Sequence, residues 1–146
     1  GLCKIKTKKQ KKLYLGNLKA KRDWGHAKDY VEAQWRILQQ KKPDDYVIAT
    51  GIQYSIKQFV NMTAKKLGMK LFWKGKGLKE KGYNNKGVPI IECDENYFRP
   101  LDVNTLLGDE KKAKTKLKWK PAENINSLID EMIESEYNLL NAVKQK

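Results

Sequence analysis

Residues 13–35 read LYLGNLKAKRDWGHAKDYVEAQW, and the rest of the chain is interpreted outward from them. A short apolar run at Lys12–Leu15 predicts a strand, and Gly16–Asn17 predicts a turn because both residues tolerate positive φ. Basic, acidic and aromatic residues are then crowded into Lys21–Trp24, just before an amphipathic helix. Polar groups this dense between a strand and a helix favour a binding site, since loops carry binding chemistry on a rigid scaffold.

Alternating apolar patterns predict the remaining elements. Asp29 with Glu32 resembles a capping box that starts a helix, and Ala27, Val31, Trp35 and Leu38 fall on one face of it, before Pro43 ends it. Ser55 with Gln58 is a second capping box, and Gly68 fits the position just after that helix ends. Further helices are expected at Leu2–Lys9 (the end of one), Glu110–Leu117 and Asn126–Val143. Further strands are expected at Tyr46–Thr50, Met69–Trp73 and Val88–Glu92.

About four short strands alternating with about four helices indicate an α/β or α+β domain. So few strands indicate that the chain is part of a larger architecture. The 146 residues are enough for one domain with a core. Residues 74–87, KGKGLKEKGYNNKG, are expected to form a binding loop or an exposed hairpin. Their KGKG start lacks the GxxxxGK[ST] spacing of a phosphate-binding loop.

The chain carries a net charge of +14, which raises the alternative of a basic nucleic-acid-binding module with Trp24, Trp73 and Tyr83 among lysines. Only three of its 31 basic residues are arginine, namely Arg22, Arg36 and Arg99. Nucleic-acid readers favour arginine, whose guanidinium group grips phosphate and base edges. Lysine spread over a solvated surface is therefore the preferred interpretation, and nucleic acid is not the expected partner.

Cysteine and histidine are too sparse for a metal site. Cys3 and Cys93 are far apart, and they fit reduced thiols of a cytoplasmic protein better than a disulfide. His26 is the only histidine, and it is expected to be a structural side chain in the turn. No apolar run reaches the roughly 18 residues that span a bilayer. No GxxGxxG dinucleotide fingerprint and no Ser/His/Asp set is visible, so no catalytic residue is assigned.

Two arginines stand beside aromatic residues and carboxylates at positions expected to have irregular backbone. Arg22 adjoins Asp23 and Trp24, and Arg99 lies close to Tyr97, Phe98 and Asp102. A guanidinium group can hold a diphosphate through two parallel hydrogen bonds. The alternative is that each arginine bridges backbone carbonyls and a carboxylate within the fold, and spacing alone leaves both interpretations open.

The motifs RDWGHAKDYVEA, YFRP and LLGD, in this order, resemble those of the GDP-mannose 4,6-dehydratases, a family of the extended short-chain dehydrogenase/reductase superfamily. The resemblance runs from about Leu13 to Glu134. It implies that residues 1–146 are a single substrate-binding domain, the C-terminal part of an α/β enzyme with an NAD(P)-binding Rossmann-like domain. The family's catalytic Thr, Glu, Tyr and Lys, and its glycine-rich loop, are expected to precede Gly1.

The resemblance also implies an activity. The family oxidises carbon 4 of the mannose of GDP-mannose, eliminates water across carbons 5 and 6, and returns the hydride to carbon 6, giving GDP-4-dehydro-6-deoxy-D-mannose for GDP-fucose and related deoxysugars. NADP is the implied cofactor, held by the missing N-terminal domain. A cytoplasmic homo-oligomer without membrane contact is expected, and the chain alone is expected to be inactive. A related nucleotide-sugar dehydratase or epimerase is a further alternative.

Residues that match the family's nucleotide-sugar pocket are Gly16, Asn17, Arg22 and Arg99, and the two arginines are the implied diphosphate contacts. Asp102 stands where the family commonly has Glu, which shortens a sugar or ribose contact by one methylene group. Other departures from the family pattern are Lys19, Lys118 and the pair Gln53–Tyr54. None of them removes a diphosphate arginine.

Overall fold

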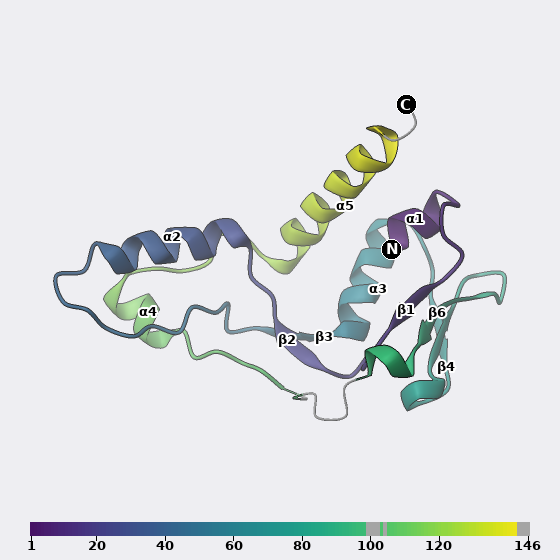
Figure 1. Ribbon diagram of the computed structural model, residues 1–146, viewed down its shortest axis with the longest axis horizontal. Coiled ribbons are helices and arrows are strands. Elements are labelled where there is room, and N and C mark those ends of the chain that lie inside the picture. The colour runs from purple at the N-terminus through teal and green to yellow at the C-terminus, as the bar shows by residue number, and fades with distance from the viewer. Residues whose placement is uncertain (99–102, 104, 143–146) are drawn as a thin grey trace.

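The computed structural model describes residues 1–98, 103 and 105–142, arranged as five α-helices and six short strands (Figure 1). The helices are α1 (Leu2–Lys6), α2 (Ala27–Leu38), α3 (Ile56–Lys66), α4 (Lys111–Lys116) and α5 (Ile125–Ala142). The strands are β1 (Leu13–Leu15), β2 (Lys21–Asp23), β3 (Gln53–Ser55), β4 (Phe72–Lys74), β5 (Lys81–Tyr83) and β6 (Pro89–Cys93). The mixed α/β class predicted from the sequence is confirmed.

A four-stranded sheet in the order β1-β6-β5-β4 forms one lobe. β1 runs parallel to β6, with Leu13 opposite Ile91, while the other two pairs are antiparallel. Helices α1, α3 and α5 pack beside this sheet and share a core with it. The buried members of that core are Leu2, Cys3, Val60, Ala64, Leu67, Ile90, Ile91 and Leu140. Its burial is the main stabilising contribution in this lobe.

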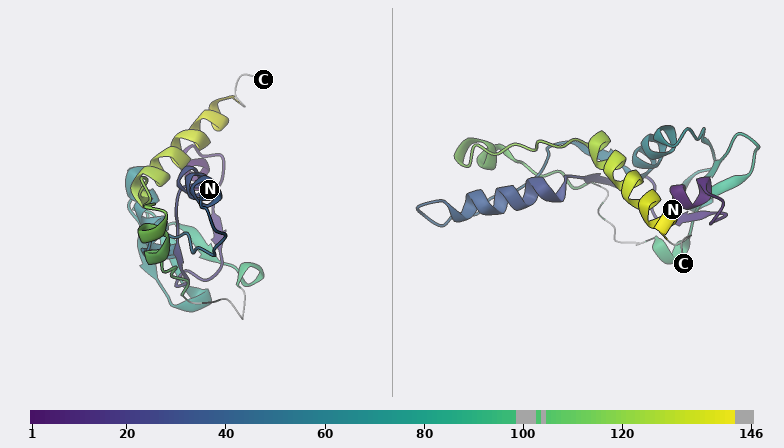
Figure 2. Two further views of the ribbon diagram at one scale, coloured as in Figure 1. Left: turned by 90° about the vertical axis from the view of Figure 1, so that its left-hand side faces the viewer. Right: turned by 90° about the horizontal axis from the view of Figure 1, so that it is seen from above.

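A second lobe is built from α2, α4 and the chain between α2 and β3. Its buried cluster is Ala33, Ala113, Leu117 and Trp119, against which Tyr46 and Ile48 pack. The antiparallel β2–β3 ladder lies between the two lobes, with Arg22 opposite Tyr54. Figure 2 shows that the second lobe extends away from the sheet, so the molecule is elongated.

Helix α3 begins and ends as predicted. The Ser55 hydroxyl accepts a hydrogen bond from the Gln58 backbone, and the Gln58 side chain accepts one from the Ser55 backbone. Gly68 has φ +67° and closes the helix through its backbone bond to Lys65. A left-handed residue at this position favours glycine, which has no Cβ to collide with the preceding turn.

Helix α2 differs from its prediction. It begins at Ala27 rather than Asp29, because the His26 side chain accepts the Lys28 backbone N–H and caps the helix. The Asp29 carboxylate is instead buried at 3% exposure and accepts the backbone N–H groups of Ala122 and Glu123, both at 3.0 Å. A local capping motif has therefore been displaced by a tertiary contact.

The predicted apolar stripe of α2 faces solvent. Val31, Trp35 and Leu38 are 62%, 61% and 80% exposed. The buried face of α2 is a different one from the predicted stripe. It carries Ala33, and Tyr30 and Ile37 pack against the same buried cluster. Helix α2 thus has one covered apolar face and one exposed apolar face.

The prediction of a strand at Tyr46–Thr50 is wrong, since these residues pair with no strand among the residues that the structure describes. The strand expected at Met69–Trp73 is present but begins at Phe72. Residues 74–87 form the end of β4, a short 3₁₀ turn at Gly77–Lys79, strand β5 and the turn into β6, so the hairpin interpretation of this stretch is confirmed. None of the helices in the described part of the chain is long and apolar enough to cross a membrane.

We expect Asp29→Ala to destabilise the chain by about 2–4 kcal/mol, because two backbone N–H groups would lose their buried carboxylate acceptor. Asp45→Ala is the matched control, since Asp45 is an exposed aspartate in the same lobe. Urea unfolding followed by tryptophan fluorescence measures both. Equal midpoints for the two variants would show that the Asp29 contacts add nothing to stability.

Candidate functional site

The Gly16–Asn17 turn follows β1 and lies against the short 3₁₀ turn Glu95–Tyr97. The Asn17 side chain accepts the Lys19 backbone N–H at 3.0 Å, which fixes the turn. A Cβ added at Gly16 would overlap the carbonyl oxygen of Tyr97. Glycine is therefore required here by close backbone approach, and the turn and residues 95–97 form one surface.

Arg22 lies on β2, and its guanidinium group is oriented by the backbone. Its Nη1 donates to the carbonyl oxygens of Lys21 and Val103, both at 2.7 Å. Lys21 also forms an isolated parallel bridge with Thr105. Val103 and Thr105 are thus held against β2 beside the guanidinium group.

Asp23 anchors β2 to the chain just before β3. One carboxylate oxygen accepts the Thr50 backbone N–H at 3.0 Å and the Thr50 hydroxyl at 2.6 Å, and the other accepts the Gly51 N–H at 2.8 Å. Hydrogen bonds to an ionised group are about twice as strong as neutral ones. This carboxylate is consequently a structural clamp next to Arg22.

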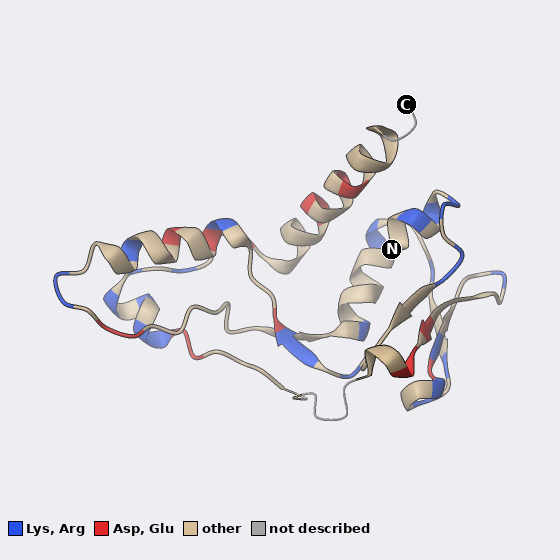
Figure 3. Ribbon diagram, viewed as in Figure 1, with Lys and Arg blue, Asp and Glu red and all other residues tan. Residues whose placement is uncertain are grey.

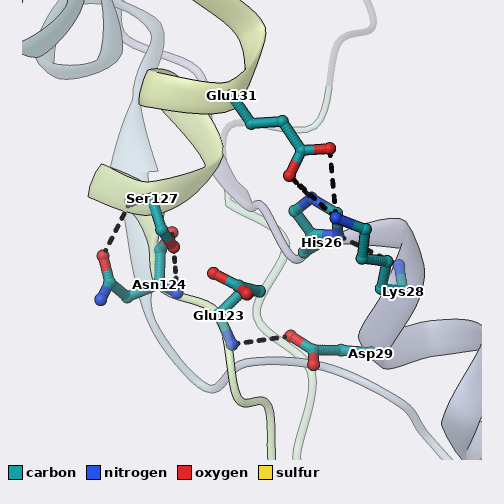
Figure 4. A network of polar contacts seen from close by, with 7 residues as sticks. All are labelled: His26, Lys28, Asp29, Glu123, Asn124, Ser127 and Glu131. Atoms are coloured by element: carbon teal, nitrogen blue, oxygen red, sulfur yellow. Dashed lines mark hydrogen bonds and ion pairs between the residues drawn. The ribbon is translucent and has the colours of Figure 1, made fainter.

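The next three residues each contact another part of the fold. The Trp24 ring packs on the Phe59 ring of α3, with centroids 4.9 Å apart. A Cβ at Gly25 would overlap the Tyr30 hydroxyl, so a larger residue here would displace the Tyr30 ring. His26 is 7% exposed, and its Nε2 lies 3.0 Å from a carboxylate oxygen of Glu131 on α5 (Figure 4).

The contacts of His26 define its tautomer. Its Nδ1 accepts the Lys28 backbone N–H at 3.1 Å, so in the neutral ring the proton is on Nε2, which donates to Glu131. Lys28 Nζ also reaches Glu131, at 3.2 Å. Lys28 first, and then His26, hold the pKa of Glu131 below its usual value. These contacts agree with the expectation that His26 is a structural side chain.

Three of the predicted site residues line one cavity of about 290 Å³. They are Gly16, Asn17 and Arg22, and the other lining residues are Leu15, Ala20, Ile56 and Tyr97. A neighbouring cavity of about 220 Å³ shares Gly16 and Asn17 and is also lined by Phe98 and Glu80. The structure thus brings the turn and the arginine together in a polar-rimmed hollow.

Arg99 and Asp102 lie outside the described residues. The nearest described residues in sequence are Phe98 and Val103. Phe98 lines the neighbouring cavity and Val103 accepts a hydrogen bond from Arg22. Each described flank of this segment therefore lies beside the candidate site.

Sequence reasoning missed the ion pair between Lys57 and the buried Glu80 beside the site. Lys57 Nζ lies 2.6 Å from the Glu80 carboxylate, whose side chain is 9% exposed, and 4.7 Å from the centroid of the Trp73 ring. No spacing signal joins a lysine on α3 to a glutamate before β5, so only the fold could reveal it. The sequence placed Tyr97 beside Arg99, but no sequence pattern predicts that the Tyr97 backbone lies against Gly16.

The described residues contain no group of three or more His, Cys, Asp or Glu side chains that could hold a metal ion. Cys3 and Cys93 are free thiols. Burial raises the pKa of both, and Glu80 raises the pKa of Cys93 further. Raised thiol pKa values indicate unreactive cysteines.

Comparison with known proteins identifies relatives of this chain. The model of the GDP-mannose 4,6 dehydratase family matches residues 1–132. GDP-mannose 4,6 dehydratase 2 of Caenorhabditis elegans is 47% identical over 141 residues, which cover 97% of this chain and 37% of that protein. The human GDP-mannose 4,6 dehydratase is 46% identical over 127 residues, covering 86% of this chain and 34% of the relative. The chain thus spans a little over a third of the length of these relatives.

Solved structures share the fold at low sequence identity. RMD from Pseudomonas aeruginosa, complexed with NADPH, matches with a TM-score of 0.69 and 16% identity, over 91% of this chain and 38% of that one. The dTDP-glucose 4,6-dehydratase of Bacillus anthracis, in complex with NAD, gives a TM-score of 0.68 and 19% identity, over 94% and 38%. The expected fold of part of an extended short-chain dehydrogenase/reductase is confirmed. The chain belongs to the GDP-mannose 4,6-dehydratase family.

Proposed function

We propose that this chain is the nucleotide-sugar-binding part of a GDP-mannose 4,6-dehydratase, which converts GDP-mannose to GDP-4-dehydro-6-deoxy-D-mannose for GDP-fucose and related deoxysugars. One observation carries the proposal. Gly16, Asn17 and Arg22, the described residues that match the family's pocket, line a single cavity although β1 and β2 belong to different sheets. The family match supports GDP-mannose as the ligand.

Arg22 is the proposed diphosphate contact. A guanidinium group stays charged and presents donors in a rigid planar fork. The two carbonyl bonds of its Nη1 restrict the plane of that fork before any ligand arrives. A pre-oriented cation loses less side-chain entropy on binding than a mobile lysine would. Arg99 and Asp102 remain predictions from the resemblance as a second diphosphate contact and a sugar or ribose contact.

The redox chemistry is proposed to lie elsewhere in the enzyme. Two solved neighbours are complexes with NADPH and NAD, which supports a nicotinamide cofactor, with NADP as our proposal. The residues of this chain do not fit a dinucleotide site, because no glycine-rich fingerprint follows a strand. We therefore assign the cofactor and the catalytic Thr, Glu, Tyr and Lys to the portion outside this sequence. A cytoplasmic homo-oligomer is part of the same proposal.

The alternative of a nucleic-acid module has less support. Figure 3 shows lysines and arginines spread over helices, strands and loops of both lobes. Several lysines are paired with carboxylates on distant segments, as in Lys12–Glu92, Lys66–Asp130 and Lys112–Asp44. A related dehydratase or epimerase for another nucleotide sugar would share this fold, but the family match favours GDP-mannose.

We expect Arg22→Ala, in the full-length enzyme, to weaken GDP-mannose binding roughly tenfold or more, because a charged hydrogen bond contributes about 1.5–3 kcal/mol. Arg22→Lys keeps the charge but not the fork, and it should recover only part of the affinity. Isothermal titration calorimetry measures all three proteins. Unchanged affinity in Arg22→Ala would remove this residue from the site.

We expect Gly16→Ala to weaken GDP-mannose binding severalfold, since the added methyl group must displace Tyr97 at the wall of the cavity. Gly87→Asn is the control, because Gly87 has positive φ and open space around it, and asparagine tolerates that backbone. The same titrations of the full-length enzyme provide the readout. If both variants bind equally well, the turn does not contact the ligand.

We expect the chain by itself to show no turnover of GDP-mannose with NADP, because the proposed catalytic groups lie outside it. Chromatographic separation of GDP-sugars after prolonged incubation is the measurement, with the human enzyme as positive control. Formation of GDP-4-dehydro-6-deoxy-D-mannose by this chain alone would contradict the assignment.

A further inference from the structure

Residues 17–22 carry two of the proposed contacts, and the first turn of α3 holds their backbone. The Leu18 carbonyl oxygen accepts a hydrogen bond from the Lys57 N–H at 3.0 Å. The Ala20 carbonyl oxygen accepts one from the Ile56 N–H at 3.1 Å. The first N–H groups of a helix have no acceptor within the helix, so these bonds satisfy donors that would otherwise be unpaired. The position of residues 17–22 therefore depends on where α3 begins.

The Lys57 side chain is fixed at its far end as well. Its Nζ lies 2.6 Å from a Glu80 carboxylate oxygen and 4.7 Å from the centroid of the Trp73 ring. An ammonium group over an indole ring is attracted by the electron-rich face of the ring. The indole N–H of Trp73 donates in turn to the Asn61 side chain, one turn further along α3, at 2.9 Å. Lys57 thus joins residues 17–22 through its backbone and the turn before β5 through its side chain.

Glu80 is a buried charge that depends on Lys57. The residue is 7% exposed, and its backbone N–H closes the short turn at Gly77–Lys79 by donating to the Gly77 carbonyl oxygen at 3.0 Å. Among the residues that the structure describes, Lys57 is its only ion-pair partner. Removing the cation that faces a buried carboxylate leaves an uncompensated charge, which is costly. The two side chains therefore hold each other in place.

The pair lies beside the proposed binding cavity but does not line it. Glu80 contributes to the neighbouring cavity of about 220 Å³, which shares Gly16–Asn17 with the binding cavity. The binding cavity itself, which Arg22 lines, is lined on the α3 side by Ile56, the residue before Lys57. Apart from the long-range effect of its charges, the pair can influence a ligand there only through the residues that it holds.

We propose that Glu80 and Lys57 are positioning residues for nucleotide-sugar binding. Glu80 holds the Lys57 side chain, and the Lys57 backbone holds the Leu18 carbonyl group. Residues 17–22 are thereby kept where their two proposed contacts reach one cavity. Binding groups that are positioned in advance lose less entropy when a ligand arrives. The inference rests on the proposed function and adds to it two residues that do not contact the ligand.

The signs of two charge changes separate positioning from simple electrostatics. Glu80→Gln removes a negative charge near a bound diphosphate, so charge alone would tighten GDP-mannose binding, whereas Lys57→Met would weaken it. If the pair positions residues 17–22, both variants bind GDP-mannose more weakly, by about five- to thirtyfold. The double variant binds no more weakly than the weaker single one, because both changes break the same ion pair. Isothermal titration calorimetry of the full-length enzyme measures the affinities.

Two further readouts are specific for positioning. Lys57→Arg keeps a charged donor for Glu80 and a cation for the Trp73 ring, so it should retain the affinity within about threefold of wild type. The turnover number kcat at saturating GDP-mannose should stay within about twofold of wild type while KM rises, since the lost interactions serve binding.

The ion pair Lys12–Glu92 is the matched control. Its two charged atoms are 2.8 Å apart in the same lobe, and neither residue lines either cavity. Lys12→Met and Glu92→Gln should leave the affinity for GDP-mannose within about twofold of wild type. Thermal unfolding of every variant verifies that it is folded. If a single variant does not fold, the uncharged pair Lys57→Met/Glu80→Gln carries the test, and it must bind more weakly than wild type.

Tighter or unchanged binding by Glu80→Gln, additive losses in the double variant, or equal losses in the control pair would each overturn the proposal. Arg22→Ala, titrated in the same series, separates this failure from that of the proposed function. A loss in Arg22→Ala without one in Glu80→Gln refutes the positioning role alone. Unchanged affinity in Arg22→Ala places the ligand elsewhere, and the positioning role then falls with the site.

Discussion

The structure depends on the five consecutive residues Arg22–His26, because each is fixed to a different part of the fold. Arg22 donates to Val103, Asp23 accepts from Thr50 and Gly51, and Trp24 packs on Phe59. Gly25 lies against Tyr30, and His26 bonds to Glu131. These contacts join the segment to α3, to α5 and to the chain before β3. Several involve ionised partners, which form the stronger class of hydrogen bond.

This constraint explains how the chain can hold Arg22, the proposed diphosphate contact, in a fixed orientation. The carbonyl oxygens that accept from Arg22 belong to backbone held by the Asp23 clamp and by the bridge from Lys21 to Thr105. The guanidinium group is thus oriented by structure rather than by the ligand. The turn at Gly16–Asn17 reaches the same cavity from the other sheet, through its close contact with Tyr97. The proposed binding residues Gly16, Asn17 and Arg22 thus come from segments that follow or form strands of two different sheets and line one cavity.

Sequence patterns predicted the features that are decided locally. The capping box of Ser55 and Gln58, the glycine that ends α3 and the turn at Gly16 depend on a few neighbouring residues, and all are present. The predicted start of α2 was wrong because the Asp29 carboxylate does not cap the helix. It accepts hydrogen bonds from backbone N–H groups of a distant segment. The prediction of a strand at Tyr46–Thr50 was wrong because a strand needs a neighbouring strand to pair with, and the described residues supply none. The pair Lys57–Glu80 could not be found either, since the two residues are joined only by the fold.

The central claim is that Arg22 holds the diphosphate of a nucleotide sugar in the cavity beside Gly16–Asn17. A crystal structure of the full-length enzyme with GDP-mannose bound tests it most directly. The account predicts a diphosphate oxygen within about 3.2 Å of an Arg22 guanidinium nitrogen, with the Nη1 contact to Val103 retained. A diphosphate bound away from β2, with Arg22 contacting only protein groups, would contradict it.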